Sequence, residues 1–314
     1  MSEDELKAIA DLVDEKIVKE ENVIGNGTFG TVVKIMYENS FVAVKRLQKR
    51  NIPTIKREIE MLKSVSIPKC SDKILCFKQS YEGENYFYIM TEYIENSQTL
   101  DKLDTAFIPV VLPILALAIQ ELHKMNFIHY DIKPENVLVY GADEDKKLKL
   151  IDLGMACSEK EIEAEEQSCK NAQHKGSAYF APPETLDMTC AEIKGKYTFE
   201  HAKGWDIYAF FDTMYTLWHP GFRDQYTSRH KKYSREAVKH EQDLDKQFAC
   251  TYQYGVKTWF AHLDDGFADW VHMELLNEKM DLFRTKVMLH DAFHRDPLRR
   301  NKAFETLLTA FRQQ

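Results

Sequence analysis

Three polar side chains that suit phosphate chemistry lie within one short stretch of the chain. The stretch is HYDIKPENVLV, residues 129–139, in which a lysine follows an aspartate by two residues and an asparagine follows it by five. Transfer of a phosphoryl group requires mainly positioning and neutralisation of charge. Asp131 can orient an attacking hydroxyl and accept its proton, Lys133 can steady the moving phosphoryl group, and Asn136 can hold a metal ion.

A further carboxylate follows Asn136 by 16 residues. Asp152 begins the triplet Asp-Leu-Gly directly after an apolar stretch, residues 148–151, which is typical of a buried strand. The separation from Asn136 is long enough for a hairpin around the polar turn at residues 141–147. Asp152 is therefore the second predicted metal ligand.

A glycine-rich stretch, GNGTFGTV at residues 25–32, carries Gly25, Gly27 and Gly30. Glycines at this spacing also open dinucleotide-binding folds, so the stretch alone is weak evidence. Here a β-rich run follows Gly30, whereas a dinucleotide fold would continue into a helix. A glycine loop between two strands allows the backbone to approach a triphosphate closely.

Lys45 ends the run VAVK, 15 residues after Gly30, in an alternating apolar strand. By itself it could be an ordinary charge on an edge strand, but together with the glycine loop it predicts a cation for the α- and β-phosphates. Its carboxylate partner is expected on the following helix, where Glu58 is the first choice and Glu60 the second. Residues two apart on a helix point in different directions, so only one of them can face the lysine.

The elements that must position these side chains change in kind along the chain. Ser2 and Glu5 form a capping box before a helix over residues 3–18. Short β-rich runs at residues 31–37, 41–47, 74–80 and 86–93 follow, interrupted by a helical stretch at 54–65, and helical patterns dominate after Glu95. This order predicts a two-lobed α+β architecture. The expected divisions are an N-terminal extension at 1–20, an N-lobe at 21–94 and a C-lobe at 95–314.

Taken together, these motifs resemble those of the eukaryotic-like serine/threonine protein kinase family. The resemblance extends from about residue 20 to about residue 310. It implies the two-lobed kinase fold, a β-rich N-lobe with one major helix and a mainly helical C-lobe. It also implies ATP and Mg2+ (or Mn2+) as cofactors and transfer of the γ-phosphate to Ser/Thr hydroxyls of protein substrates. The catalytic positions that it implies are Asp131, Lys133, Lys45 and Glu58.

The resemblance also assigns the nucleotide and metal positions. Residues 89–94, IMTEYI, resemble the hinge, with Thr91 as gatekeeper and the backbones of Glu92 and Ile94 reaching adenine. The implied nucleotide-binding positions are Gly25, Gly27, Gly30, Val32, Ala43, Lys45, Thr91, Glu92, Ile94 and Leu138. The implied metal ligands are Asn136 and Asp152. Late in the chain, Asp206 resembles the residue that ties down the catalytic loop, and Arg300 is expected to pair with Glu184.

Several departures from the family pattern affect regulation. Tyr130 replaces the arginine that normally reads a phosphorylated activation loop, Leu153 replaces a phenylalanine, and Pro182 replaces an alanine before Pro183-Glu184. An insertion is predicted near residues 190–203. Additional negative charge would repel an activation segment that already contains Glu159, Glu161, Glu163, Glu165 and Glu166. These features predict activity without activation-loop phosphorylation.

Two other functions remain open at this point. A pseudokinase, acting as an ATP-binding scaffold, could keep the same residues for structural reasons, although such proteins usually lose at least one of them. A small-molecule kinase of related fold would share the aspartate and asparagine of the catalytic loop. Such enzymes generally lack the equivalents of Lys133 and of the Glu184–Arg300 pair, so a protein substrate is favoured.

The remaining expectations concern partners and location. A net charge of −8 disfavours nucleic acid, which basic proteins bind through phosphate contacts. A basic stretch at residues 229–240 would place Lys231, Arg235 and Lys239 on one helical face. Water and the protein's own glutamates are the simpler partners for these cations. The sharper hypothesis is a polyanionic ligand, an inositol phosphate or a lipid headgroup.

The chain is also expected to lack a transmembrane segment and to be cytoplasmic, or to be delivered to a host cytosol if it is a microbial effector. The apolar run at residues 106–119 is too short to span a bilayer and contains two prolines. The six cysteines form no dense framework, so they are expected to be reduced thiols.

Overall fold

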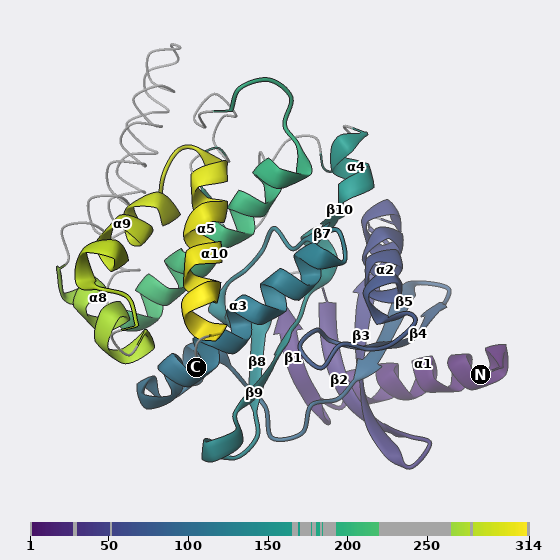
Figure 1. Ribbon diagram of the computed structural model, residues 1–314. Coiled ribbons are helices and arrows are strands. Elements are labelled where there is room, and N and C mark those ends of the chain that lie inside the picture. Colours follow the sequence, from purple (N-terminus) through teal and green to yellow (C-terminus); the bar gives the residue numbers. More distant parts are fainter. Residues whose placement is uncertain are drawn as a thin grey trace, which may run out of the picture. The chain divides into compact units, whose positions relative to one another are not determined.

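The computed structural model describes residues 2–27, 30–50, 52–164, 169, 177, 180–182, 184, 193–219, 265–276 and 279–312 (Figure 1). The chain divides into two compact units. Unit 1 comprises Met1–Ser97 and Lys149–Gly154, and unit 2 comprises Gln98–Leu148 and Met155–Gln314. The first is built on a sheet and the second mainly on helices, so the α+β composition that the sequence predicted is confirmed.

Unit 1 contains a sheet of five antiparallel strands in the order β1-β2-β3-β5-β4. Its elements are α1 (Glu3–Val18), β1 (Val23–Gly27), β2 (Gly30–Tyr37), β3 (Ser40–Gln48), α2 (Ile52–Ser66), β4 (Phe77–Glu82) and β5 (Tyr86–Glu92). Alternating burial along β2 and β3 gives the sheet a core-facing surface, because successive side chains of a strand point to opposite faces.

Helix α1 begins with the predicted capping box between Ser2 and Glu5. Its Ala10 and Val13 are buried in a cluster with residues of β2, β3 and β5, and its Asp14 accepts a hydrogen bond from the hydroxyl of Tyr88 at 2.8 Å. The guanidinium of Arg46 lies 3.0 Å from the same carboxylate. The helix predicted for residues 3–18 is therefore present, and it packs against the sheet of unit 1.

Strand β4 begins at Phe77, whereas the sequence predicted a strand from residue 74. Ile74 instead forms an isolated parallel bridge with Leu150. The backbone N–H of Leu75 also donates to the carbonyl of Leu150 at 3.0 Å. The apolar residues before Phe77 therefore follow the strand that leads to Asp152.

The described part of unit 2 includes three long helices, α3 (Ile108–Lys124), α5 (Phe199–Trp218) and α10 (Pro297–Arg312), which contact one another (Figure 1). The other α-helices among its described residues are α4 (Glu159–Glu163), α8 (Asp265–Trp270) and α9 (Leu282–Ala292), and a π-helical turn lies at Val271–Leu275. Its strands are short: β6 (Gln98–Thr99), β7 (Phe127–Ile128), β8 (Val137–Tyr140) and β10 (Cys157–Ser158). Strand β9 (Lys147–Leu150) begins in unit 2 and continues into unit 1.

Close helix packing explains one glycine of α5. A Cβ atom on Gly204 would lie 2.6 Å from the Cβ of Pro297 and 2.8 Å from its carbonyl oxygen. Only glycine therefore permits this contact between α5 and the first turn of α10. Further along α5, the buried rings of Phe210 and Phe211 make edge-to-face contacts with each other and with Phe304 and Phe293, respectively.

The stretch Thr105–Lys124 has the length and the hydropathy, 1.9, of a membrane-spanning helix, and half of it is buried inside the fold. Core helices of soluble proteins meet the same criterion. The apolar side of α3, including Leu112, Leu115 and Ile119, is fully buried. This helix is therefore explained by the core of unit 2.

Two disulfides correct the expectation that the cysteines are thiols. Cys70 is joined to Cys76 in unit 1, and Cys157 is joined to Cys169 in unit 2. The Cα atoms of the two pairs lie 5.4 and 6.1 Å apart in the fold. The spacing of the cysteines in the sequence did not indicate which of them would be brought together. The basic stretch at 229–240, with Lys231, Arg235 and Lys239, lies outside the described residues.

Candidate active site

The glycine loop joins β1 to β2, and the register of the sheet places its residues beside the strand of Lys45. Gly25 lies opposite Val32, and Val32 lies opposite Lys45. Gly30 has a φ of +155°, and a Cβ atom there would come within 2.2 Å of the carbonyl oxygen of Arg46. Gly30 therefore has to be glycine for the start of β2 to lie so close to the carbonyl of Arg46 in β3. Gly27 pairs with Gly30 at the end of β1.

Lys45 forms the ion pair that the sequence predicted. Its Nζ lies 2.7 Å from Oε1 of Glu58 and 3.5 Å from Oδ1 of Asp152, whereas Glu60 is exposed on α2. Burial by itself lowers the pKa of Lys45, but the charges of Glu58 and Asp152 outweigh it, so the pKa lies above its ordinary value. Lys45 is therefore held as a cation between two carboxylates.

The predicted hinge residues lie at the end of β5. Thr91 is buried and stands opposite Ala43 of β3, and Ile94 is also buried. The backbone N–H of Glu92 donates to the carbonyl of Cys76 at 3.0 Å. A contact of this residue with adenine would therefore use its carbonyl oxygen.

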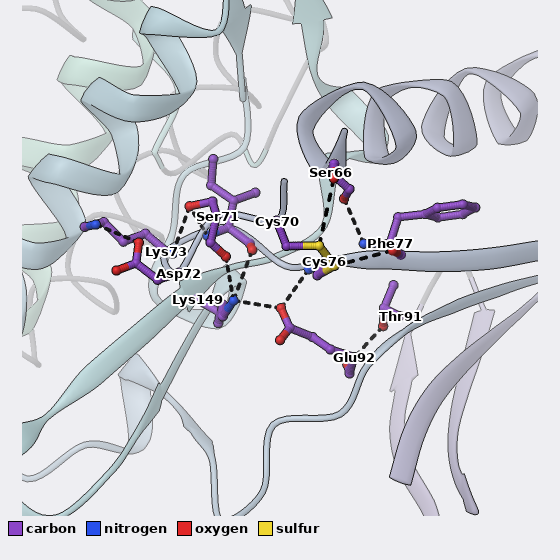
Figure 2. A network of polar contacts seen from close by, with 11 residues as sticks. Ser66, Cys70, Ser71, Asp72, Lys73, Cys76, Phe77, Thr91, Glu92 and Lys149 are labelled. Atoms are coloured by element: carbon purple, nitrogen blue, oxygen red, sulfur yellow. Dashed lines mark hydrogen bonds and ion pairs between the residues drawn. A yellow bond between two sulfur atoms is a disulfide. The ribbon is translucent and has the colours of Figure 1, made fainter. Parts of the chain in front are cut away.

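A buried lysine that the sequence analysis missed connects the hinge to the strand of Asp152 (Figure 2). Lys149 donates to the carbonyl of Ser71 at 2.8 Å and lies 2.8 Å from Oε1 of Glu92. The same carboxylate oxygen accepts from the backbone N–H of Cys76 at 2.8 Å. The sequence did contain an indication of this residue, because Lys149 interrupts an apolar strand. A lysine in such a strand is buried only when its charge is paired.

The catalytic-loop residues of unit 2 converge on the carboxylate of Asp131. Lys133 Nζ lies 2.7 Å from its Oδ2, and Nδ2 of Asn136 donates to Oδ2 at 2.9 Å and to the backbone carbonyl of Asp131 at 2.8 Å. Asp131 and Asn136 are nearly buried, which limits their motion. Lys133 and Asn136 therefore both orient the carboxylate of Asp131, and the charge of Lys133 neutralises it.

Ser177 completes this cluster, and the sequence analysis did not single it out. Its backbone N–H donates to Oδ1 of Asp131 at 2.7 Å, and its hydroxyl accepts from Lys133 Nζ at 2.7 Å. The only sequence signal was a hydroxyl residue next to Gly176 in the expected end of the activation segment. Lys133 therefore bridges the general-base candidate and the substrate-facing segment.

Asp206 fixes the backbone of the catalytic loop from within α5. Its Oδ1 accepts from the N–H of Tyr130 at 2.8 Å, and its Oδ2 accepts from the N–H of His129 at 2.8 Å. Nε2 of His123 lies 2.9 Å from Oδ2. Tyr130 has a φ of 63°, so its backbone lies in the left-handed region, and these hydrogen bonds hold it there.

The expected ion pair between Glu184 and Arg300 is present and completely buried. The guanidinium donates to both carboxylate oxygens at 2.6 and 3.0 Å. It also donates to the carbonyls of His294 at 2.7 Å and Gly204 at 3.3 Å. The pair therefore joins the end of the activation segment to α10 and α5.

Tyr130 occupies the position where the family has an arginine, and it is 1% exposed. Its ring packs edge-to-face on Trp205, with centroids 5.1 Å apart. Burial first, and then interaction with Tyr130, raises the pKa of Tyr197 well above its ordinary value. Two phenols and an indole thus occupy the place where the family has an arginine, and none of the three offers a cation to a phosphate.

The predicted metal ligands offer suitable donors. The amide nitrogen of Asn136 donates to Asp131, so its amide oxygen points in another direction. The side chain of Asp152 is 32% exposed. Oxygen donors of this kind suit Mg2+, which binds few protein ligands and retains water. Asn136 belongs to unit 2, which also contains Leu138 of β8. Asp152 belongs to unit 1, which also contains the glycine-rich stretch.

Comparison with known proteins gives a consistent result. A family model described as the protein kinase domain matches residues 18–301. Calcium-dependent protein kinase 3 of Plasmodium yoelii yoelii is 25% identical over 177 residues, which cover 53% of this chain and 31% of that protein. Calcium-dependent protein kinase 4 of Plasmodium falciparum is 27% identical over 184 residues, covering 54% and 33%.

A fungal protein is similar at the same level. Mitosis inhibitor protein kinase SWE1 of Candida albicans is 28% identical over 170 residues, covering 46% of this chain and 14% of that protein. This chain therefore spans about a third or less of the length of these three relatives.

Proposed function

Because this chain belongs to the protein kinase family, we propose that it transfers the γ-phosphate of ATP to serine or threonine hydroxyls of protein substrates, with Mg2+ (or Mn2+). The observation that carries the proposal is the bridge from Lys133 to both Asp131 and Ser177. It places a lysine between the general-base candidate and the segment that would face a substrate. This lysine is the feature that small-molecule kinases of related fold generally lack.

Each unit supplies part of the chemistry. In unit 2, Asp131 accepts the proton of the attacking hydroxyl, and Lys133 neutralises charge on the phosphoryl group as it leaves ADP. In unit 1, Lys45, held by Glu58, binds phosphate oxygens. Asn136 and Asp152 would hold Mg2+, which when bound neutralises the phosphates. A pseudokinase remains the alternative, and it would bind ATP through the same residues without transfer.

The deciding experiment compares wild type with Asp131→Asn. Purified protein is incubated with γ-labelled ATP, Mg2+ and a mixed protein substrate, and the labelled residues are identified by mass spectrometry. Loss of the general base should lower phosphotransfer by about 10²–10⁴, while nucleotide affinity is retained. Equal transfer by both proteins would refute the assignment of Asp131. Nucleotide binding with no transfer by wild type would support a pseudokinase. Label found on small molecules alone would support a small-molecule kinase.

We also propose that activity does not require phosphorylation of the activation segment. The buried ring of Tyr130 offers no charge to a phosphate. Helix α4 brings Glu159, Glu161 and Glu163 to the start of the segment, so an added phosphate would meet repulsion. Treatment with a broad phosphatase, with dephosphorylation verified by mass spectrometry, should leave the rate unchanged. A loss of activity that a kinase-treated sample regains would contradict this proposal.

A polyanionic ligand at Lys231, Arg235 and Lys239 remains a prediction from the sequence alone. The test compares the melting temperature and activity of wild type with and without a highly phosphorylated inositol. The triple alanine variant at these positions is the control. No effect of the anion on wild type would end the idea.

A further inference from the structure

The sheet of unit 1 presents different residues on its two faces. In its register Lys45 lies opposite Val32, and Ala43 lies opposite Thr91, so these four nucleotide-binding positions share one face. The residues between them point to the other face, which is called here the back face. Its apolar members in the described core are Val33, Ile35, Val42, Val44, Tyr88 and Met90. The back face therefore belongs to the same strands as the nucleotide positions but is directed away from them.

Helix α1 covers the back face. Ala10 and Val13 are 4% and 0% exposed and pack in one cluster with the six residues of the back face, none of which is more than 6% exposed. The residues that match the protein kinase domain begin at 18, where α1 ends. The helix is thus a layer that lies almost wholly outside the matched residues and is nevertheless part of the core of unit 1.

Asp14 brings a carboxylate into this interface. Its Oδ1 lies 3.0 Å from the guanidinium of Arg46, and its Oδ2 accepts from the hydroxyl of Tyr88 at 2.8 Å. Arg46 and Tyr88 lie opposite each other in β3 and β5. One side chain of α1 therefore holds both members of a cross-strand pair.

The arginine of this pair is the neighbour of the phosphate-binding lysine. Arg46 follows Lys45 in β3, so the two side chains point to opposite faces of the sheet. On the nucleotide side, Glu58 of α2 lies 2.7 Å from Lys45. On the back face, Asp14 of α1 lies 3.0 Å from Arg46. Two consecutive residues of β3 are therefore held by carboxylates from two different helices.

The turn after α1 connects the same helix to the glycine-rich stretch. Residues 19–22 join α1 to β1, and within them Glu20 and Asn22 both have a φ of 55°, in the left-handed region. The carbonyl of Asn22 accepts from the N–H of Lys34 in β2 at 2.9 Å. The turn is short and attached to the sheet, so the position of α1 also bears on the strand that begins the glycine-rich stretch.

We propose that Asp14 is a positioning residue for nucleotide binding, which fixes from the back face the part of β3 that presents Lys45 to the phosphates. This inference rests on the proposed kinase function and names a further residue on which that site depends. Without the carboxylate, α1 still packs through its apolar side chains. Lys45 then loses one of the two attachments of its strand.

The two donors distinguish Asp14 from an ordinary surface charge. A partly exposed ion pair contributes little by itself, because water screens it. Here a nearly buried hydroxyl shares the carboxylate with the guanidinium. Burial first, and then the hydrogen bond to Asp14, raises the pKa of Tyr88, so this hydroxyl remains a donor at neutral pH.

The test uses binding of a non-hydrolysable ATP analogue with Mg2+, measured by titration calorimetry. Wild type is compared with Asp14→Ala and with Asp11→Ala, a control that removes an exposed carboxylate from the same helix. Tyr88→Phe keeps the ring and removes one donor, and it serves as the second variant if Asp14→Ala does not fold. Circular dichroism and melting curves establish that each variant is folded at the temperature of the titration.

Asp14→Ala should bind the analogue about fivefold more weakly, while Asp11→Ala binds as wild type does. Tyr88→Phe should weaken binding in the same direction. Adding Tyr88→Phe to Asp14→Ala should cause no further loss, because both changes remove the same contact. In steady-state kinetics the KM for ATP should rise and the KM for protein substrate should stay unchanged.

A merely structural role would lower the melting temperature and leave the affinity for the analogue unchanged in folded protein. Unchanged affinity in folded Asp14→Ala, an equal loss in Asp11→Ala, or an additive loss in the double variant would overturn the proposal. Folded Tyr88→Phe with wild-type affinity would do so where Asp14→Ala does not fold.

The affinity measurement requires no phosphotransfer, so it separates this proposal from the proposed function. If wild type binds the analogue but transfers no phosphate, the chain is a pseudokinase, and weaker binding by Asp14→Ala still supports the positioning role. If wild type does not bind the analogue, both the ATP-dependent function and the role of Asp14 are refuted.

Discussion

Replacing Arg300 by methionine would remove the cation at a junction of three parts of unit 2. The guanidinium donates to both oxygens of Glu184 and to the carbonyls of His294 and Gly204. Arg300 is 0% and Glu184 is 1% exposed, so water cannot replace these contacts without opening the core. Methionine fills much of the same space, which keeps the effect from being one of cavity formation.

The size of the effect follows from this geometry. Removing one partner of a buried ion pair leaves the other charge poorly compensated, which typically costs about 3–5 kcal/mol. A kcal/mol shifts the melting temperature by about 2–4 °C in a domain of this size. The expected loss for Arg300→Met is therefore about 6–20 °C. The double variant Arg300→Met/Glu184→Leu should recover most of this loss, since an apolar pair often replaces a buried ion pair at little cost.

Calorimetry of wild type, both single variants and the double variant gives a double-mutant cycle for the Glu184–Arg300 pair. Hydrogen exchange then shows which parts of the protein lose stability. Reduced protection should centre on α5, α10 and the backbone near Glu184 rather than on the sheet of unit 1. The kcat/KM for protein substrate should fall in Arg300→Met, because Glu184 ends the substrate-facing segment. A loss below about 1 kcal/mol would place the pair among weakly contributing surface pairs and would refute the argument from burial.

Two further predictions concern histidine and lysine side chains. His201 accepts from the N–H and hydroxyl of Thr198 at the start of α5, and burial lowers its pKa below the ordinary value despite the opposing charges of Asp296 and Glu200. The unfolded chain therefore takes up the proton first, so stability should be full above about pH 6.5 and fall as the pH drops through the folded pKa. A His201→Gln variant, which keeps an acceptor, should flatten this dependence between pH 7.5 and 5.5 in thermal unfolding, and an unchanged slope would contradict it. Lys149→Met should destabilise unit 1 by about 3 kcal/mol in urea unfolding, because Glu92 loses its buried cation, and Lys147→Met at an exposed position is the control.

The convergence of the candidate catalytic residues could be predicted from their spacing in the sequence. Asp131, Lys133 and Asn136 lie within six residues of chain, and a short loop can bring such near neighbours onto one carboxylate. The partner of Lys45 was also predictable, because the helical pattern of residues 54–65 allows Glu58 and Glu60 to face different directions. Helix α1 followed from its capping box and apolar spacing.

Other parts of the site depend on contacts between distant segments, which spacing does not reveal. Ser177 reaches Asp131 across 46 residues, and Lys149 reaches Ser71 across 78. The cysteine pairs are separated by only 6 and 12 residues, but their oxidation depends on burial and geometry that composition does not encode. The low density of cysteines in the sequence led to the prediction of reduced thiols. That prediction is wrong at the four cysteines that form the two disulfides.

Tyr130 stands where the family has an arginine, and its surroundings bear on the proposal that the activation segment needs no phosphate. A phosphate is recognised by a cation, and a cation placed beside Trp205 at a position 1% exposed would itself need a buried partner. The phenol avoids that cost by packing, and the carboxylates of α4 already give the start of the segment negative charge. An added phosphate on this segment would therefore need a cation other than residue 130, and it would meet the negative charge of α4. Both arguments lead to the same expectation, that the proposed activity does not depend on a phosphate there.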